Sequence, residues 1–270
     1  MNEVYRLEDI TVQYRKQQDA LSQVALSVGE GEMLSVIGSN GSGKSSLLHL
    51  MNGLIFPDKG TVYFKNERID QETLKNKSFN QWFRQQVGYV FQDPDSQLFC
   101  PTVFDELLFG PLQMGMKKEA AYARVEEVMK MLHIDCLHDR PSYMLSGGEK
   151  KRVAIGSVLT MNPGVLLLDE PMSGLDPKTR SYMIELIFQL NEAGKTIIIT
   201  THHLELVDHL KSRVVVLSEQ HRIMKSGSAG EILTDTDLLV RANLIYEQPH
   251  QHGDIRHRHL PVGFLSHRHD

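Results

Sequence analysis

One stretch of the chain constrains its fold more than any other: an apolar strand that leads into a glycine-rich loop and then a helix. The letters MLSVIG (residues 33–38) are nearly all apolar, as in a strand buried on both faces. GSNGSGKS (38–45) fits the phosphate-loop pattern G-x-x-x-x-G-K-[ST]. KSSLLHLMNGL, from residue 44, has the apolar spacing of a helix. This order predicts backbone N–H groups and a helix N-terminus that surround a polyphosphate.

The loop residues have individual expected roles. Lys44 should reach the β- and γ-phosphates of a nucleotide, and the Ser45 hydroxyl should ligate Mg²⁺. A flexible loop that matches the pattern by chance is the alternative, but the strand before it and the helix after it make chance a poor explanation. The expected ATP contacts from this stretch are Gly38, Ser39, Asn40, Gly41, Ser42, Gly43, Lys44, Ser45 and Ser46.

The rest of the chain alternates between strand and helix patterns. The runs TVYF, VGYVF, VLLLDE, TIIITTHH and RVVVL indicate further strands. This alternation predicts an α/β fold with a P-loop NTPase core, a mostly parallel sheet with helices on both faces. Residues 4–14 alternate apolar and polar, which predicts a half-exposed strand pair in an antiparallel β subdomain. Residues 93–150 predict an inserted helical subdomain.

Composition excludes several classes of protein. The chain has 270 residues and a net charge of −5, whereas a nucleic-acid binder should be basic. No apolar run approaches the roughly 20 residues that span a bilayer, and no secretory signal is expected at the start. Cys100 and Cys136 have no metal-binding or redox spacing. We expect a reduced, cytoplasmic protein whose folded domain covers residues 1–245.

Two further motifs carry chemistry. In VLLLDE (165–170), a buried strand ends in Asp169, which could hold Mg²⁺, and Glu170, which could act as the general base toward water. Such a strand end is common by itself, but it gains weight after a phosphate loop. In LSGGEKKR (145–152), Ser146 and Glu149 have capping-box spacing, which could simply start a helix. The two glycines between them, Gly147 and Gly148, favour instead a second phosphate cradle for another subunit's nucleotide.

In this order, the motifs resemble those of ATP-binding-cassette (ABC) ATPases, over about residues 4–235. GSNGSGKS stands as Walker A, LSGGE (145–149) as the signature and VLLLDE as Walker B. The resemblance implies that Tyr14 stacks on adenine and that Gln92 contacts Mg²⁺ and couples the site to a partner. It also implies that His202 reaches the γ-phosphate and that Asp176 belongs to the D-loop SGLD.

The same resemblance has consequences for the assembly. It implies ATP with Mg²⁺, held by Ser45, Gln92 and Asp169, in a head-to-tail dimer with a second copy or a close paralogue. The signature residues Ser146, Gly147, Gly148 and Glu149 would then close on the partner's ATP. His203 replaces a frequent aspartate, Met172 a threonine and Glu149 the usual glutamine. None of these departures removes a phosphate or magnesium contact.

The segment FQDPDSQLFCPTVFDELLFGP (residues 91–111) indicates which type of ABC ATPase the chain resembles. It is similar to a segment of energy-coupling-factor importers, which carry vitamins or cobalt and nickel ions. The resemblance implies a membrane scaffold subunit docked near residues 93–109, a substrate-binding membrane subunit and a location at the cytoplasmic face of the cell membrane. No nucleic-acid partner is expected. A single cassette without coiled coil or membrane helices fits this class, and a soluble non-transport ATPase is the more distant alternative.

The last residues, 246–270, lose all periodicity and are expected to form a disordered tail. Proline and glycine make a helix there unfavourable, and an extended chain would place the residues of each His-x-His pair on one side. Neutral imidazoles could bind cobalt or nickel loosely, so the tail favours the cobalt/nickel branch over vitamin importers, although a solvated end without a role remains open. The candidate ligands are His250, His252, His257, His259, His267 and His269.

Overall fold

A six-stranded sheet forms the centre of the molecule, and the computed structural model describes it within residues 2–14, 18–245, 248–252 and 255–259. Its strands are β3 (Met33–Ile37), β6 (Val87–Val90), β7 (Val165–Asp169), β8 (Thr196–Thr201), β9 (Arg213–Leu217) and β10 (Ile223–Ser228). The strand order is β10-β9-β3-β8-β7-β6, and only β10 runs antiparallel to its neighbour. Apart from TVYF (residues 61–64), which belongs to the second sheet, the expected apolar runs are therefore strands of one mostly parallel sheet, which confirms the predicted α/β class.

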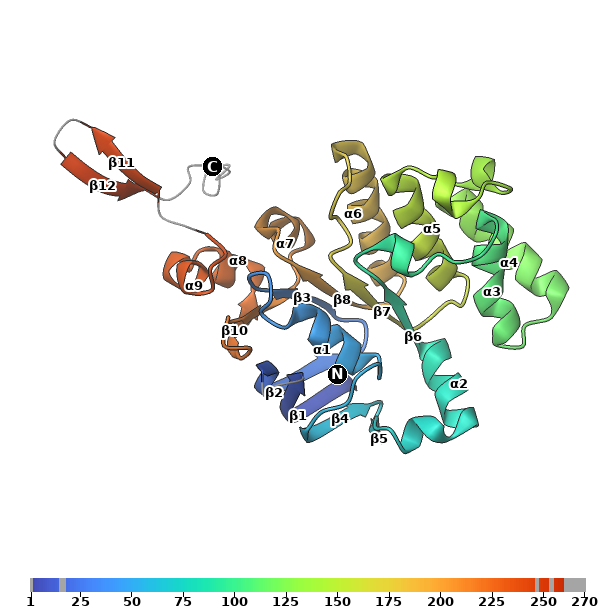
Figure 1. Ribbon diagram of the computed structural model, residues 1–270, viewed down its shortest axis with the longest axis horizontal. Helices are drawn as coiled ribbons and strands as arrows, with labels where there is room; N and C mark the ends of the chain where they lie inside the picture. The colour runs from blue at the N-terminus through green and yellow to red at the C-terminus, as the bar shows by residue number, and fades with distance from the viewer. Residues whose placement is uncertain (1, 15–17, 246–247, 253–254, 260–270) are drawn as a thin grey trace.

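A second, antiparallel sheet lies beside the first and has the order β2-β1-β4-β5 (Figure 1). Its strands are β1 (Glu3–Tyr14), β2 (Gln18–Gly29), β4 (Lys59–Phe64) and β5 (Glu67–Arg68). The alternating pattern at the start of the chain is β1, which pairs with β2 along most of its length. Helix α1 (Lys44–Met51) lies between the two sheets, and its buried leucines share a core with both.

Successive residues of the central strands pack into cores on opposite faces of the sheet. Leu167 and Ile198 belong to the core that contains α1, whereas Leu166 and Ile199 belong to the core on the other side. The helices of that second core include α6 (Pro177–Glu192) and α7 (Leu204–Leu210). Because residues on both faces of β7 and β8 are buried, these strands are apolar without interruption, as the sequence indicated.

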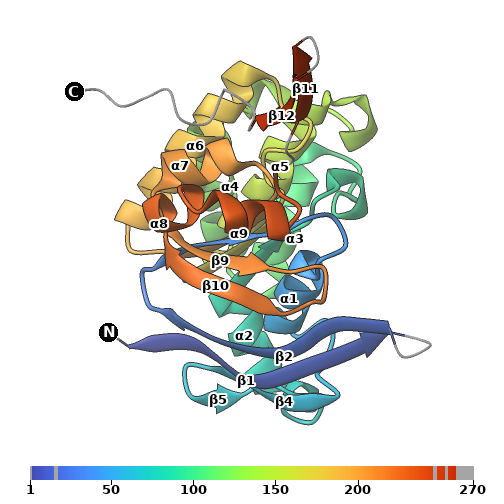
Figure 2. The same ribbon diagram turned by 90° about the vertical axis from the view of Figure 1, so that its left-hand side faces the viewer.

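The inserted helices form a lobe at one end of the molecule (Figure 1). They are α3 (Val103–Gln113), α4 (Lys118–Met131) and α5 (Gly147–Leu159). Three shorter helices lie elsewhere: α2 (Lys77–Gln86) after the antiparallel sheet, and α8 (Ala229–Leu233) and α9 (Thr236–Arg241) above β9 and β10 (Figure 2). No helix in the described ranges combines the length and apolarity needed to cross a bilayer.

The region expected to be an irregular tail contains a hairpin. Strands β11 (Gln248–His252) and β12 (Ile255–His259) pair antiparallel, with His250 opposite His257 in the register. A period-two sequence suits a strand as well as an extended coil, and the expected disorder of residues 246–270 stays a prediction. His267 and His269 lie outside the described residues.

Candidate nucleotide-binding site

A cleft of about 750 Å³ opens between the glycine-rich loop, the start of β2 and the carboxyl end of β7. Loops at the carboxyl ends of the strands form its floor, as is usual for open α/β sheets. The residues that line it are Tyr14, Asp19, Ala20, Asn40, Gly41, Gly43, Lys44, Ser45, Ser46, Gln92, Glu170 and His221. Most of the residues expected to contact ATP therefore meet in one cavity.

The loop is shaped by close backbone contacts and leaves polar atoms free. Gly43, the N-cap of α1, has a φ of 105°, and a Cβ atom there would lie 2.3 Å from the carbonyl oxygen of Ala20. No larger residue fits without moving β2. The hydroxyl oxygens of Ser39 and Ser42 are buried and have no hydrogen-bond partner among the described residues. Orphaned polar atoms in a glycine loop at a helix N-terminus fit a phosphate group.

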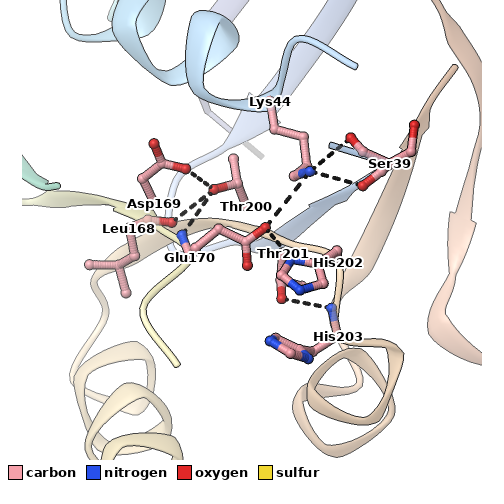
Figure 3. Close-up of polar contacts among 10 residues, drawn as sticks. Ser39, Lys44, Leu168, Asp169, Glu170, Thr200, Thr201, His202 and His203 are labelled. Carbon is pink, nitrogen blue, oxygen red and sulfur yellow. Dashed lines mark hydrogen bonds and ion pairs between the residues drawn. The ribbon is translucent and has the colours of Figure 1, made fainter. Parts of the chain in front are cut away.

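Lys44 is folded back onto the loop (Figure 3). Its Nζ donates to the carbonyl oxygens of Gly38 at 2.8 Å and Ser39 at 3.1 Å. It also lies 3.7 Å from Oε1 of Glu170. Burial lowers the pKa of Lys44, and the attraction of Glu170 and Asp169 acts in the opposite direction. The ammonium group is thus at the cleft, where an entering polyphosphate would supply stronger partners than carbonyl oxygens.

Tyr14 stands at the other end of the cleft, at the end of β1. Its ring is half exposed, and its hydroxyl is 3.2 Å from the Ser46 hydroxyl at the start of α1. This contact fixes the ring beside the loop while leaving a face open to solvent. An aromatic surface in that position can stack on a nucleotide base.

Asp169 is buried at the end of β7 and is held by two hydroxyl groups. Thr200 Oγ1 donates to its Oδ1 at 2.5 Å, and the Tyr89 hydroxyl donates to its Oδ2 at 3.3 Å. Burial, with the charge of Asp169, raises the pKa of Tyr89, so the phenol remains a donor. Both partners are neutral hydroxyl groups, so neither offsets a negative charge on Asp169, which is a candidate ligand for a cation. The donor set of hydroxyl, carboxylate and amide oxygens fits Mg²⁺.

Glu170 occupies a strained and buried position. Its φ is 45°, in the left-handed region that glutamate seldom adopts, and it is 4% exposed. Its N–H donates to the carbonyl oxygen of Thr200 at 3.1 Å, which holds the turn. Its Oε1 is 2.8 Å from Nδ1 of His202, while its Oε2 is buried without a hydrogen-bond partner in the described residues (Figure 3). The turn thus directs a carboxylate oxygen with free acceptor capacity into the site.

The loop after β6 places Gln92 in the cleft through a contact that the sequence did not reveal. The Gln92 side chain is exposed and lines the cavity, and its backbone oxygen accepts from Nζ of Lys151 at 2.7 Å. The same ammonium donates to the Phe91 carbonyl oxygen at 3.2 Å. Lys151 is 1% exposed, and burial lowers its pKa to about 8. A buried cation on α5 thus fixes the backbone of the glutamine loop.

Two more contacts join this loop to α5. The Gln97 side chain accepts from the Phe91 N–H at 3.1 Å and donates to the Ala154 carbonyl oxygen at 2.6 Å. Lys150 and Asp95 form an ion pair at 2.6 Å. These contacts connect the helical lobe to the loop that carries Gln92.

The signature residues lie at the N-terminus of α5, away from the cleft of their own chain. Ser146 and Glu149 do form the capping box: the Ser146 N–H donates to Glu149 Oε2 at 2.7 Å, and the Glu149 N–H donates to Ser146 Oγ at 3.4 Å. A Cβ at Gly147 would have no heavy atom within 4 Å, and one at Gly148 would make only ordinary contacts at 3.5 Å. Nothing in the described fold of one chain requires either glycine.

The D-loop aspartate and the histidines after β8 have other local contacts. Asp176 caps α6 by accepting from the N–H groups of Lys178 and Thr179, both at 3.0 Å. The rings of His202 and His203 lie 4.1 Å apart between centroids. Burial lowers the pKa of His203, and the neighbouring His202 adds to that effect.

Several residues of the site had no signal in the sequence. Asp19, Ala20 and His221 line the cleft because the start of β2 and the turn after β9 fold over the loop. Thr200 reaches Asp169 because β7 and β8 pair in parallel with these two residues in register. These contacts depend on strand pairing between distant segments, which local patterns do not encode.

Known proteins resemble the chain over nearly its whole length. Residues 21–173 match the family described as ABC transporter. A putative ABC transporter ATP-binding protein of Methanosarcina acetivorans is 45% identical over 273 residues, which cover 100% of this chain and 99% of that protein. The energy-coupling factor transporter ATP-binding protein EcfA of Methanosphaera stadtmanae is 40% identical over 245 residues, covering 90% of this chain and 86% of the relative.

A solved structure agrees with these sequences. The structure of cbiO1 from Clostridium perfringens, described as part of the ABC transporter complex cbiONQ, superposes with a TM-score of 0.76 at 34% identity. The likeness covers 90% of this chain and 96% of that chain.

Proposed function

This chain belongs to the ABC transporter family, as an ATP-hydrolysing subunit of the energy-coupling-factor type, and we propose that it powers the import of cobalt or nickel ions. The observation that carries the choice of ion is the set of His-x-His pairs between His250 and His269. Imidazole nitrogen is a good ligand for divalent cobalt and nickel, which favours a metal ion over a vitamin as the cargo.

The cleft supports a specific division of work in ATP hydrolysis. Tyr14 stacks on adenine, while Lys44 and the loop N–H groups bind the β- and γ-phosphates. Ser45, Gln92 and Asp169 would hold Mg²⁺, which would neutralise charge on the phosphate oxygens. Glu170 accepts a proton from the attacking water, and His202 holds that carboxylate and contacts the γ-phosphate.

A second subunit completes the site in this proposal. The space in front of Gly147 and Gly148 admits a partner's γ-phosphate to the N-terminus of α5, where backbone N–H groups and the helix dipole stabilise anions. Ser146, Gly147, Gly148 and Glu149 of one subunit thus close on ATP held by the other, and Asp176 lies at the same face. The second subunit is another copy of this chain or a close paralogue.

The helical lobe supports docking of membrane subunits. Phe99 and Phe109 are 68% and 44% exposed and contact each other edge to face at a centroid distance of 5.0 Å. Tyr143 and Met144 on the same lobe are also exposed. A contiguous exposed apolar patch marks an interaction surface, and the pair of Phe99 and Phe109 is a candidate for part of one. A membrane scaffold subunit bound near residues 93–109, together with a substrate-binding subunit, would hold the chain at the cytoplasmic face of the cell membrane.

Reconstitution tests the proposed substrate. The tagged chain is purified from membranes of its source together with its bound partners and placed in vesicles with ATP and radioactive Co²⁺ or Ni²⁺. We expect ATP-dependent uptake of metal that is lost when the chain carries Lys44→Ala. Uptake of a vitamin without metal uptake would overturn the ion assignment. Failure of any membrane protein to co-purify would favour a soluble, non-transport ATPase.

A further inference from the structure

A cluster of metal-binding groups lies at the edge of the cleft and includes a residue that has no role in hydrolysis. Glu170, His202 and His203 each offer one ligand atom, and these atoms lie within 4.8 Å of one another. It is the one such group of three found in the described residues. Glu170 follows β7 and the histidines follow β8, so the parallel pairing of adjacent strands brings them together (Figure 3).

The donor set suits a transition metal rather than magnesium. Two imidazoles with one carboxylate are typical ligands of zinc, cobalt, nickel and ferrous iron, whereas Mg²⁺ prefers oxygen ligands throughout. Metal–nitrogen bonds of about 2.0 Å place tetrahedral ligands about 3.3 Å apart, so side-chain movements of about 1 Å would complete the geometry. Oε2 of Glu170 is buried and has no hydrogen-bond partner among the described residues, so this atom can donate a lone pair to a metal ion.

One member of the cluster lies outside the nucleotide cleft. His203 does not line that cleft but lines a separate hollow of about 190 Å³ beside α6 and α7. Arg180 also lines the hollow, and Lys44 lies 3.7 Å from Oε1 of Glu170. These two cations oppose a bound metal ion and limit its affinity, which favours a site that loads only when free metal is abundant.

We propose that a divalent transition-metal ion binds Glu170, His202 and His203 and reversibly inhibits ATP hydrolysis. A bound ion occupies the carboxylate that accepts the proton of water and the imidazole that contacts the γ-phosphate. It therefore keeps both groups from the reaction. If the transported ion is cobalt or nickel, a point that rests on the proposed function, the site gives feedback by imported metal.

Binding of Co²⁺ alone tests the site. The full-length chain is used with its six tail histidines replaced by glutamine, so that the tail contributes no ligands. Without nucleotide, we expect one Co²⁺ per chain and the visible absorption of a four- or five-coordinate ion. His203→Gln should weaken binding at least about tenfold, and His203→Cys, which supplies another ligand, should restore it. His138→Gln, at an exposed histidine on the helical lobe, is the matched control and should bind like the parent.

Inhibition tests the consequence. With ATP and excess Mg²⁺, added Co²⁺ should inhibit the parent and His138→Gln alike. His203→Gln should retain its hydrolysis rate without cobalt and need at least about tenfold more Co²⁺ for half-inhibition. Equal Co²⁺ binding by the parent and His203→Gln would overturn the site. Lost binding with unchanged inhibition would overturn the regulatory role. Neither result would affect the transport proposal, which uptake tests separately.

Discussion

Lys151 shows how one buried ammonium group joins two motifs that lie far apart in the sequence. It comes from the helix that follows the signature, and it donates to two carbonyl oxygens of the loop that carries Gln92. A charge that is 1% exposed is costly unless its hydrogen bonds are satisfied. Lys151 therefore links the helical lobe to the cleft, and the burial of its charge lowers the stability of the fold.

The depressed pKa of Lys151 predicts a pH-dependent stability. The pKa is about 8 in the folded chain and near 10.5 when unfolded, so the unfolded state binds more protons between these values. The free energy of unfolding should therefore rise with pH across this window, by up to about 3 kcal/mol from this group. In Lys151→Met that contribution should be absent. Urea unfolding at about pH 7.5 and about pH 10 measures how the free energy of unfolding of each protein changes with pH. The contributions of other titrating groups cancel when the two proteins are compared. Parallel pH dependence would show that the ammonium is not destabilised by burial.

At the scale of single elements, the N-terminus of α5 does two jobs. Its capping box stabilises the helix, and its two glycines leave space that the described chain does not fill. Helix α8 has the same capping box, formed by Ser228 and Glu231, but it lies away from the signature. The chain thus offers a matched pair of helix caps that separates the structural role from the proposed role in a dimer.

Substitution of both caps by arginine tests this separation. Ser146→Arg should bind ATP but fail to form the ATP-dependent dimer, with hydrolysis reduced at least about 100-fold, because the side chain fills the space for a partner's phosphate. Ser228→Arg should lose about 1 kcal/mol of stability and keep its activity. ATPase assays, nucleotide binding and size measurements decide the outcome. If Ser146→Arg dimerises and hydrolyses normally, the second cradle is only a helix cap.

The hairpin of β11 and β12 gives an element-scale prediction for the histidine-rich end. The register of the two strands sets His250 opposite His257. A chain that ends at Gln248 should keep full ATPase activity, because every expected phosphate contact lies earlier. It should lose most of its Ni²⁺ or Co²⁺ binding. Calorimetry that finds equal metal binding with and without residues 249–270 would remove the tail's role and weaken the choice of ion.

Local sequence patterns predict the strands and the phosphate loop. The run from Met33 through Lys44 could be predicted because strand, glycine loop and helix are adjacent in the chain. The ties from Lys151 and Gln97 to the glutamine loop could not, because they join residues that meet only after the helical lobe packs. Strands β11 and β12 have no burial signal in the sequence, because their residues are nearly all polar and show no alternation of apolar and polar side chains.

At the scale of the whole molecule, two parts of the chain have different roles. The cleft at the carboxyl ends of β3 and β7 binds ATP, and the helical lobe presents the signature and the exposed aromatics. Lys151, Gln97 and the Lys150–Asp95 pair link the two. We infer that closure of two subunits around ATP pulls the lobes, and that hydrolysis by Glu170 lets them reopen.

The hydrolysis rate and the oligomeric state of Glu170→Gln with Mg²⁺ and ATP test the proposed closure of two subunits around ATP most directly. Glutamine keeps the shape of the side chain but cannot accept a proton, so hydrolysis should fall at least about 100-fold while ATP binding remains. Light scattering should then show a stable dimer with ATP and a monomer without nucleotide. Hydrolysis near the wild-type rate in the purified variant, or a chain that stays monomeric with ATP bound, would contradict the account.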